Sequence, residues 1–352
     1  MKSLIKSIAL AGLVLCGCTQ NRDLLLVGTF TDTDSEGIYS YAFNQDNGKW
    51  ELLAVTPADN PAFINKAGAE EVLCVSENGT EKDGVGLYKV DRASGKLEME
   101  KFANTATIGP CYVSTNGKLV LTANYSGGSL DVFSSSLELM NSIPAATGGP
   151  HPNQAEGHMH CAYFTTDGEY ILITDFSADR IHSLKIEDEG LIDYSEADVK
   201  PGSGPRHITF SPNNKFAYVI GELSGEITAF EYAHGTLTQI QTAVADSLGG
   251  QGSADIHLSP DGKFLYSSNR LKGDGIAIFS VDAQTGLLSK AGYCPTQTHP
   301  RNFCISPNGK WLLCACRDGN SVQIFRRDPR SGLLKDTRND IPVSHPVCVM
   351  FP

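Results

Sequence analysis

Seven short segments of similar pattern recur along this chain, and they limit its possible folds more than any other feature. Each opens with Gly, His, Asn or Ser beside Pro or a small residue and continues into an apolar strand. The segments are Asn60-Pro-Ala-Phe-Ile-Asn, Gly109-Pro-Cys-Tyr-Val-Ser, Gly157-His-Met-His-Cys-Ala-Tyr-Phe, Gly204-Pro-Arg-His-Ile-Thr-Phe, Gly252-Ser-Ala-Asp-Ile-His-Leu, His299-Pro-Arg-Asn-Phe-Cys-Ile and His345-Pro-Val-Cys-Val-Met-Phe. They recur at roughly 45 to 50 residues, the period of four-stranded β-propeller blades.

The other strands of each repeat also leave a pattern. Six segments are followed by a tight turn, such as Ser259-Pro-Asp-Gly, and then by a second strand, such as Lys263-Phe-Leu-Tyr-Ser-Ser. Outer strands such as Ile276-Ala-Ile-Phe alternate or nearly alternate, as half-buried strands do. The sequence shows no long amphipathic helix. We therefore expect an all-β fold.

The two ends of the chain complement each other. The segment that starts at His345 has no room for a second strand after it, and the strand Leu24-Leu-Leu-Val-Gly has no such segment before it. An unpaired strand edge is a liability that ring closure removes. We predict a seven-bladed β-propeller over residues 24–352, closed by pairing of the C-terminal strand with the N-terminal blade.

The first residues have a different character. Lys2 and Lys6 precede an apolar stretch that ends in Leu15-Cys-Gly-Cys18, as in a bacterial lipoprotein signal. This predicts a signal peptide over residues 1–17, lipidation at Cys18 and a tether over 18–23. We expect a protein of the cell envelope, lipid-anchored on the periplasmic or surface side, with Cys18 its only link to the membrane. The alternative is a cytoplasmic protein with an apolar N-terminus.

Charge and cysteine content exclude some classes of function. The whole chain carries a net charge of −12, which argues against nucleic acid or an anionic membrane surface as a partner. Most of the ten cysteines fall within predicted strands, where cysteine is usually a small buried hydrophobe. Cys314-Ala-Cys316 lacks a partner pair, so we predict no metal site there. The sequence does not decide whether any two of the cysteines form a disulfide.

The repeat also predicts which polar residues meet. The start of each first strand and the end of each second strand must lie together at one mouth of the central channel. Polar residues fall at these places: His158, His160, Arg206, His207, His257, Arg301 and His345 on first strands, and Glu77, Asn78, Asn124, Tyr125, Asp175, Glu222, Asn269, Arg270, Arg317 and Asp318 after second strands. Gathering such groups costs desolvation unless a ligand or pairing offsets it. A polar ligand site at this mouth is the prediction.

The residue types narrow the chemistry. Arginines facing one mouth suit a carboxylate or phosphate, and a His and a Glu beside them can move protons. The alternative for a single residue is structural: Arg206 could pair with Glu222, and His257 could be a core histidine. The sequence has no nucleophile elbow, phosphate loop or dinucleotide fingerprint. We predict no cofactor and no metal.

Several of these motifs resemble one known family. Gly202-Ser-Gly-Pro-Arg-His, Gly221-Glu-Leu-Ser-Gly, Pro300-Arg-Asn-Phe and the run from Ile256 to Arg270 look like the seven-bladed propeller lactonases. That family includes a bacterial 6-phosphogluconolactonase and is similar to propeller-type carboxy-cis,cis-muconate lactonizing enzymes. The resemblance covers essentially residues 24 to 352.

The resemblance implies an active site and a reaction. The family's His, two Arg and Glu fall here on His160, Arg206, Arg270 and Glu222, as catalytic residues. His158, His207, His257, Asn269 and Arg301 are expected to bind substrate, a small anionic lactone or sugar acid. The family's His-Pro-His run reads Gly157-His-Met-His here, so the functional histidine is either His158 or His160. We expect hydrolysis of a sugar lactone. The alternative is a non-catalytic envelope propeller that binds an anionic ligand or protein.

Overall fold

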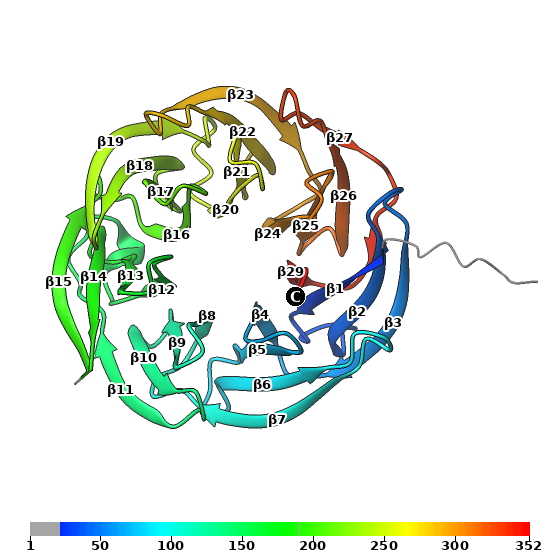
Figure 1. The fold of residues 1–352 in the computed structure, drawn as a ribbon, viewed down its shortest axis with the longest axis horizontal. Coiled ribbons are helices and arrows are strands. Elements are labelled where there is room, and N and C mark those ends of the chain that lie inside the picture. Colours follow the sequence, from blue (N-terminus) through cyan, green and yellow to red (C-terminus); the bar gives the residue numbers. More distant parts are fainter. Residues whose placement is uncertain (1–21, 189) are drawn as a thin grey trace, which may run out of the picture.

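Seven antiparallel sheets stand around a common axis in the computed structural model, which describes residues 22–188 and 190–352 (Figure 1). The first strand of each blade lies next to the axis. These strands are β29 (Pro346–Met350) in blade 1, then, in blades 2 to 7, β4 (Pro61–Lys66), β8 (Pro110–Thr115), β12 (Met159–Phe164), β16 (Pro205–Phe210), β20 (Ser253–Leu258) and β24 (Pro300–Ile305). The predicted count of seven blades is confirmed.

The remaining strands follow outward in the same order in every blade. The second strands are β1 (Arg22–Thr29), β5 (Glu71–Ser76), β9 (Leu119–Asn124), β13 (Tyr170–Asp175), β17 (Phe216–Gly221), β21 (Phe264–Asn269) and β25 (Trp311–Cys316). The third strands are β2 (Gly37–Asn44), β6 (Gly84–Val90), β10 (Ser129–Ser134), β14 (Arg180–Glu187), β18 (Glu226–Ala233), β22 (Gly275–Val281) and β26 (Ser321–Arg327).

The fourth strands form the outside of the ring (Figure 1). They are β3 (Trp50–Pro57), β7 (Leu97–Asn104), β11 (Leu139–Pro144), β15 (Gly190–Asp198), β19 (Thr236–Val244), β23 (Leu288–Pro295) and β27 (Leu334–Asp336), with β28 (Ile341–Pro342) also paired to β26. The 3-10 turn η1 (Pro152–Gln154) is the one helical element in the described part of the chain. That part contains no helix with the length and apolarity to span a bilayer.

The ring closes through blade 1, as predicted. β29 pairs antiparallel with β1, with Val27 opposite Val349 and Leu26 opposite Met350. Val347 and Val349 are 1% and 2% exposed, so the closing strand is part of the core. β1 begins at Arg22, two residues before the predicted boundary at Leu24. The predicted signal peptide and Cys18 lie outside the described residues.

The core lies between neighbouring blades. Leu25, Phe43 and Val349 of blade 1, for example, belong to one buried cluster with Leu313 and Ile324 of blade 7. Sheet faces that pack in this way bury the apolar side of each alternating strand. The eight described cysteines are free thiols, and all lie in strands, including Cys294 near the end of β23.

Candidate functional site

A left-handed residue leads into most of the first strands. Asn60, Gly109, Gly204, His299 and His345 have φ between 41° and 73°, and Pro follows each of them. Gly adopts this conformation freely, and Asn and His are among the residues enriched in it. Pro has no backbone N–H to donate, so it is confined to strand starts and edges. The recurrent Gly/Asn/His-Pro pattern is therefore a backbone requirement of the repeat.

A β-bulge follows at the start of every first strand. In blade 5, Pro205 pairs with Gly221 and His207 pairs with Ile220, so Arg206 between them has no ladder partner. The same shift recurs in the other six blades. Bulges redirect side chains and are common beside active sites. The residues placed in this way are Ala62, Cys111, His160, Arg206, Ala254 (with Asp255), Arg301 and Val347.

A second set of equivalent positions follows the second strands. Glu222 donates its backbone N–H to the carbonyl of Gly204 (2.8 Å), and the same bond occurs once in each blade. This bond holds the end of the second strand against the start of the first. The residues fixed in this way are Phe30, Glu77, Tyr125, Phe176, Glu222, Arg270 and Arg317. Both sets therefore lie at the same end of the ring.

Glu222 lies between two arginines. Its Oε2 is 2.9 Å from Nε of Arg206 and 3.2 Å from Nη2 of Arg270. The arginine side chains are only 3% and 6% exposed, and that of Glu222 is 20% exposed. Burial raises the pKa of Glu222, but the three cations Arg270, Arg206 and Arg301 together outweigh burial and lower it. The carboxylate is therefore ionised at neutral pH, and its Oε1 has no hydrogen-bond partner among the described residues.

The same two guanidinium groups are fixed by further contacts. Arg206 Nη1 donates to the carbonyl of Ala254 (2.6 Å) and lies 3.2 Å from Nε2 of His207. Arg270 donates from Nε to the carbonyl of Gly252 (2.7 Å), and its Nη1 lies 3.3 Å from Nε2 of His299. Each of these two guanidinium groups therefore already contacts three protein groups, which fix its position.

The two candidate histidines have different surroundings. His160 is buried, with Nδ1 3.6 Å from the thiol of Cys111 and its ring 5.2 Å from that of His207. Burial, Arg206 and His207 hold the pKa of His160 well below its usual range, so it is neutral. His158 precedes β12, stacks on Tyr125 and donates Nδ1–H to the carbonyl of that residue (2.6 Å). Of the two candidate histidines, His160 is therefore the one that interacts electrostatically with Arg206. Its Nε2 makes no hydrogen bond to the described residues.

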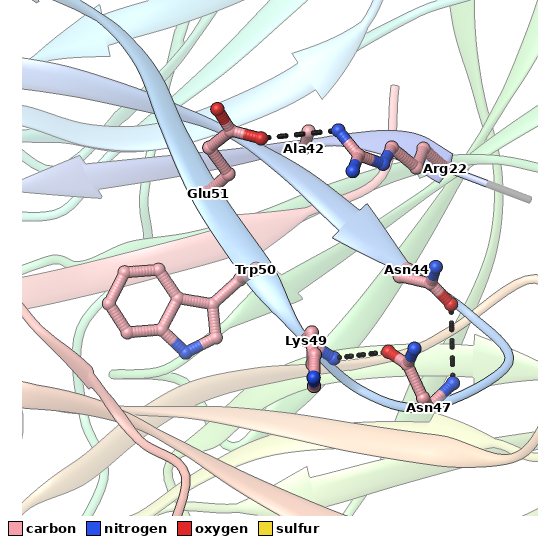
Figure 2. A pocket seen from close by; sticks show the side chains of 7 residues that line it. All are labelled: Arg22, Ala42, Asn44, Asn47, Lys49, Trp50 and Glu51. Carbon is pink, nitrogen blue, oxygen red and sulfur yellow. Dashed lines mark hydrogen bonds and ion pairs between the residues drawn. The ribbon is translucent and has the colours of Figure 1, made fainter. Parts of the chain in front are cut away.

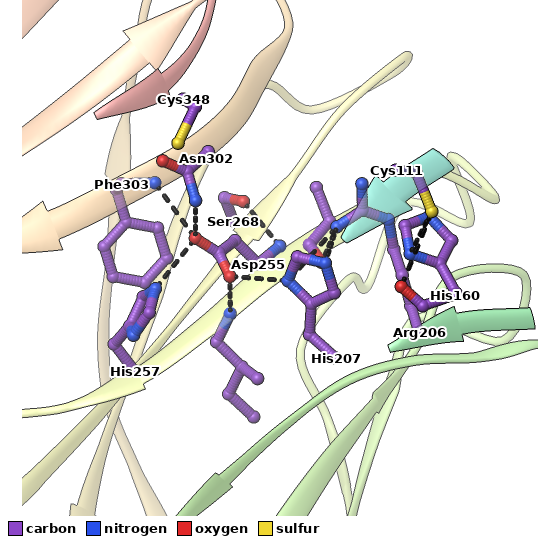
Figure 3. A network of polar contacts seen from close by, with 12 residues as sticks. Cys111, His160, Arg206, His207, Asp255, His257, Ser268, Asn302, Phe303 and Cys348 are labelled. Atoms are coloured by element: carbon purple, nitrogen blue, oxygen red, sulfur yellow. Dashed lines mark hydrogen bonds and ion pairs between the residues drawn. The ribbon is translucent and has the colours of Figure 1, made fainter. Parts of the chain in front are cut away.

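Asp255 joins the other two predicted histidines (Figure 3). Its carboxylate accepts from Nδ1 of His207 (2.8 Å), Nε2 of His257 (2.9 Å), Nδ2 of Asn302 (2.6 Å) and the backbone N–H of Phe303 (3.1 Å). Burial and Arg206 lower the pKa of His207 to about 4 in spite of Asp255. Burial opposes charge on His257 as well, but there Asp255 outweighs it and raises the pKa. Sequence reasoning missed Asp255, although an acid inside an apolar strand was a visible signal.

Asn269 and Arg301 differ in how open they are. Asn269 is fully buried, accepts from Ser253 Oγ (2.6 Å) and donates to the carbonyl of Ala245 (3.3 Å), which ties it to its own surroundings. Arg301 lies over the ring of Phe30 (5.2 Å to the centroid), and its Nη2 is 3.6 Å from Oε2 of Glu77. The guanidinium of Arg301 makes no hydrogen bond within residues 22–188 and 190–352. All of its N–H donors are therefore open to a ligand, whereas Arg206 and Arg270 are each partly engaged.

Two hollows lie elsewhere, on the outer strands. The one in Figure 2, of about 340 Å³, is lined by residues of β1 to β3, including Trp50 and the Arg22–Glu51 ion pair (3.1 Å). A larger one, of about 1210 Å³, lies between blades 3 and 4 and is lined by Met140 and Ile192 among others. In the described part of the chain, no three His, Cys, Asp or Glu side chains converge as a metal site requires.

Comparison with known proteins assigns the chain to a family. The family model for the seven-bladed β-propeller lactonases matches residues 24–351. The chain belongs to this family. It is 34% identical to a 6-phosphogluconolactonase of Bacillus subtilis, over 92% of this chain and 97% of that protein.

Two solved structures of this family are also similar. A structure from Bacteroides fragilis, solved as that of a candidate 6-phosphogluconolactonase, shares 43% identity, with a TM-score of 0.92 over 95% of this chain and 99% of that one. The periplasmic gluconolactonase PpgL of Pseudomonas aeruginosa shares 31% identity, with a TM-score of 0.89 over 94% and 100% of the two chains. The propeller and the family resemblance expected from the sequence are thus confirmed.

Proposed function

We propose that this protein hydrolyses a sugar lactone at the cluster around Glu222, where the first strands begin at the channel mouth. The observation that carries the proposal is the environment of Glu222 in a lactonase propeller. Arg206 and Arg270 keep its carboxylate ionised through Oε2 alone, which leaves Oε1 to accept a proton. Neutral His160 and the open guanidinium of Arg301 lie in the same electrostatic cluster.

In the proposed reaction these groups assist the attack of a water molecule on the lactone, and the ring then opens. Glu222 Oε1 takes a proton from water as the water oxygen attacks the carbonyl carbon of the lactone. Arg301 stabilises the charge that develops on the carbonyl oxygen or holds an anionic group of the substrate. The ring C–O bond then breaks, and the ring oxygen takes up the proton. Nε2 of His160 is the other candidate base, and Arg206 and Arg270 orient Glu222.

The alternative function is a non-catalytic propeller that binds an anionic ligand. The ion pairs of Glu222 with Arg206 and Arg270 favour it, because a locked carboxylate is typical of a binding site. Two free acceptors favour the enzyme: Oε1 of Glu222, whose side chain is 20% exposed, and Nε2 of His160, which makes no hydrogen bond within residues 22–188 and 190–352. We therefore place hydrolysis first.

Two relatives and the N-terminal sequence support a proposal for the substrate and the location. The Bacillus subtilis relative is named a 6-phosphogluconolactonase, and the Pseudomonas aeruginosa structure is named a periplasmic gluconolactonase. A phosphorylated sugar lactone belongs to the cytosol. With a lipoprotein signal over residues 1–17 and an anchor at Cys18, a gluconolactone without phosphate fits best, and the protein acts in the cell envelope.

The test is turnover by purified mature protein on glucono-δ-lactone and its 6-phosphate, with spontaneous hydrolysis subtracted. Glu222→Gln should lower kcat more than it changes KM, because a general base acts in the transition state. Arg301→Ala should lower kcat/KM about ten- to a hundred-fold, as expected for lost charge-assisted hydrogen bonds. Glu226→Gln, in the same blade and paired with exposed Lys200, is the matched control. If both lactones remain at the spontaneous rate but bind, the binding propeller replaces the enzyme.

A further inference from the structure

Glu77 and Arg301 both retain hydrogen-bonding capacity that the described residues do not use. Oε2 of Glu77 is buried and has no hydrogen-bond partner within residues 22–188 and 190–352. Its nearest cation is Nη2 of Arg301 at 3.6 Å, which is too long for a hydrogen bond. A buried carboxylate oxygen without a partner is costly, and native proteins rarely leave one without a reason.

The position of Glu77 places it in the same cluster as Glu222. Its backbone N–H donates to the carbonyl of Asn60 (3.0 Å), the bond that Glu222 makes to Gly204 in blade 5. Arg301 interacts electrostatically with both carboxylates, and Arg206 interacts with Glu77 as well as with Glu222. Blades 2 and 5 therefore each supply one carboxylate to the site, at equivalent positions of the repeat.

The two carboxylates differ in how they are satisfied. Oε2 of Glu222 receives two guanidinium groups at 2.9 and 3.2 Å, and Oε2 of Glu77 receives no hydrogen bond. Burial raises the pKa of Glu77, although Arg301 and Arg206 oppose the rise. An ionised carboxylate needs a donor and a protonated carboxyl needs an acceptor, so a partner that can do both suits Glu77 in either state. A hydroxyl group does both.

We propose that Glu77 and Arg301 form a subsite that recognises a hydroxyl group of a sugar lactone. Glu77 Oε2 bonds the hydroxyl, and Arg301 donates to a neighbouring oxygen of the same molecule. Arg301 is held for this by the face of the Phe30 ring. The inference rests on the proposed hydrolysis, and it names the substrate class: lactones that carry hydroxyls, in preference to unsubstituted lactones.

The subsite predicts selectivity, because a site built for a hydroxyl penalises a substrate that lacks one. Glucono-δ-lactone and δ-valerolactone share the six-membered ring, and only the first carries hydroxyls. The ratio of their kcat/KM values should fall at least tenfold in Glu77→Leu, because the glucono-δ-lactone alone loses a hydroxyl contact. Glu77→Gln keeps an acceptor and a donor and should retain most of the ratio. Glu81→Leu, exposed in the same loop, should behave as the parent.

The outcomes separate this inference from the proposed function. If the parent hydrolyses both lactones and Glu77→Leu leaves their ratio unchanged, the subsite is wrong and the hydrolysis stands. If the parent hydrolyses neither, the hydrolysis is wrong, and calorimetric titration with gluconate tests the subsite alone. A tenfold weaker binding by Glu77→Leu then supports it, and equal binding overturns it. If Glu77→Leu does not fold, Glu77→Ala takes its place in both measurements.

Discussion

Replacement of Glu222 by alanine should lower the stability of the fold as well as the rate of lactone hydrolysis. The carboxylate is the acid that pairs with both Arg206 and Arg270, whose side chains are 3% and 6% exposed. Without it, two buried guanidinium groups keep their charge and lose their counter-ion. Removal of one partner from a buried ion pair typically costs about 3–5 kcal/mol.

We expect the loss of unfolding free energy in Glu222→Ala to lie at the lower end of that range. Glu222 itself is 20% exposed, so water can partly replace its carboxylate, and we expect a cost of about 3 kcal/mol. A change of 1 kcal/mol shifts Tm by about 2 °C in a large domain, so Tm should fall by roughly 6 °C. Since the pKa of Glu222 is lowered in the fold, its contribution is complete above the ordinary value of 4.5 and fades as the pH falls through the lowered value.

Thermal unfolding of matched variants measures this. Glu226→Ala is the control, because it breaks an ion pair with Lys200, whose side chain is 64% exposed, and such pairs contribute at most about 1 kcal/mol. The Tm of Glu222→Gln should lie between those of Glu222→Ala and Glu226→Ala, since the amide oxygen still accepts a hydrogen bond from one guanidinium. If Glu222→Ala melts within about 1 °C of the control at pH 7, the carboxylate does not act as the counter-ion. The excess loss should also shrink below pH 4.5.

Three further predictions concern closure, pH and location. Deletion of residues 345–352 removes β29 with buried Val347 and Val349, each worth about 1.5–3 kcal/mol, so cooperative unfolding by circular dichroism should be lost; a parental melting curve would contradict the closure. The kcat/KM for the lactone should stay level as the pH falls through 6.5, because the pKa values of both His160 and Glu222 lie below their ordinary values; a fall centred at 6.5 would refute this. Cys18→Ser should abolish metabolic labelling with fatty acid, and an unlabelled parent would rule out the anchor.

The fold was predictable because its causes are local and repeated. A left-handed residue before Pro starts five of the first strands, and glycines such as Gly262 and Gly309, with φ of 67° and 69°, complete the turns that follow. Each of these backbone requirements can be recognised from a few consecutive residues. The closure was predictable because each end of the chain lacks a strand that the other has.

For the site, the sequence predicted which residues lie close together but not how their side chains interact. The repeat places Arg206, Glu222 and Arg270 together, since they occupy equivalent ends of neighbouring strands, and it allowed for an ion pair between Arg206 and Glu222. It does not show which guanidinium is already engaged. That depends on side-chain directions at the bulges, which leave Arg301 open. The role of Asp255 likewise depends on contacts between three blades.

The ring closure also sets the order in which the molecule can become active during synthesis. Phe30 is made among the first residues of blade 1, yet its backbone N–H bonds to the carbonyl of His345, and Arg301 of blade 7 lies over its ring. Until residues 346–350 emerge, blade 1 has an exposed inner edge and this part of the cluster has no fixed shape. Domains generally fold as units from the N-terminal side during synthesis, but this one cannot be completed before its last strand. A chain that lacks β29 therefore leaves the inner edge of β1 unpaired, and an unpaired edge is a site for pairing with other chains.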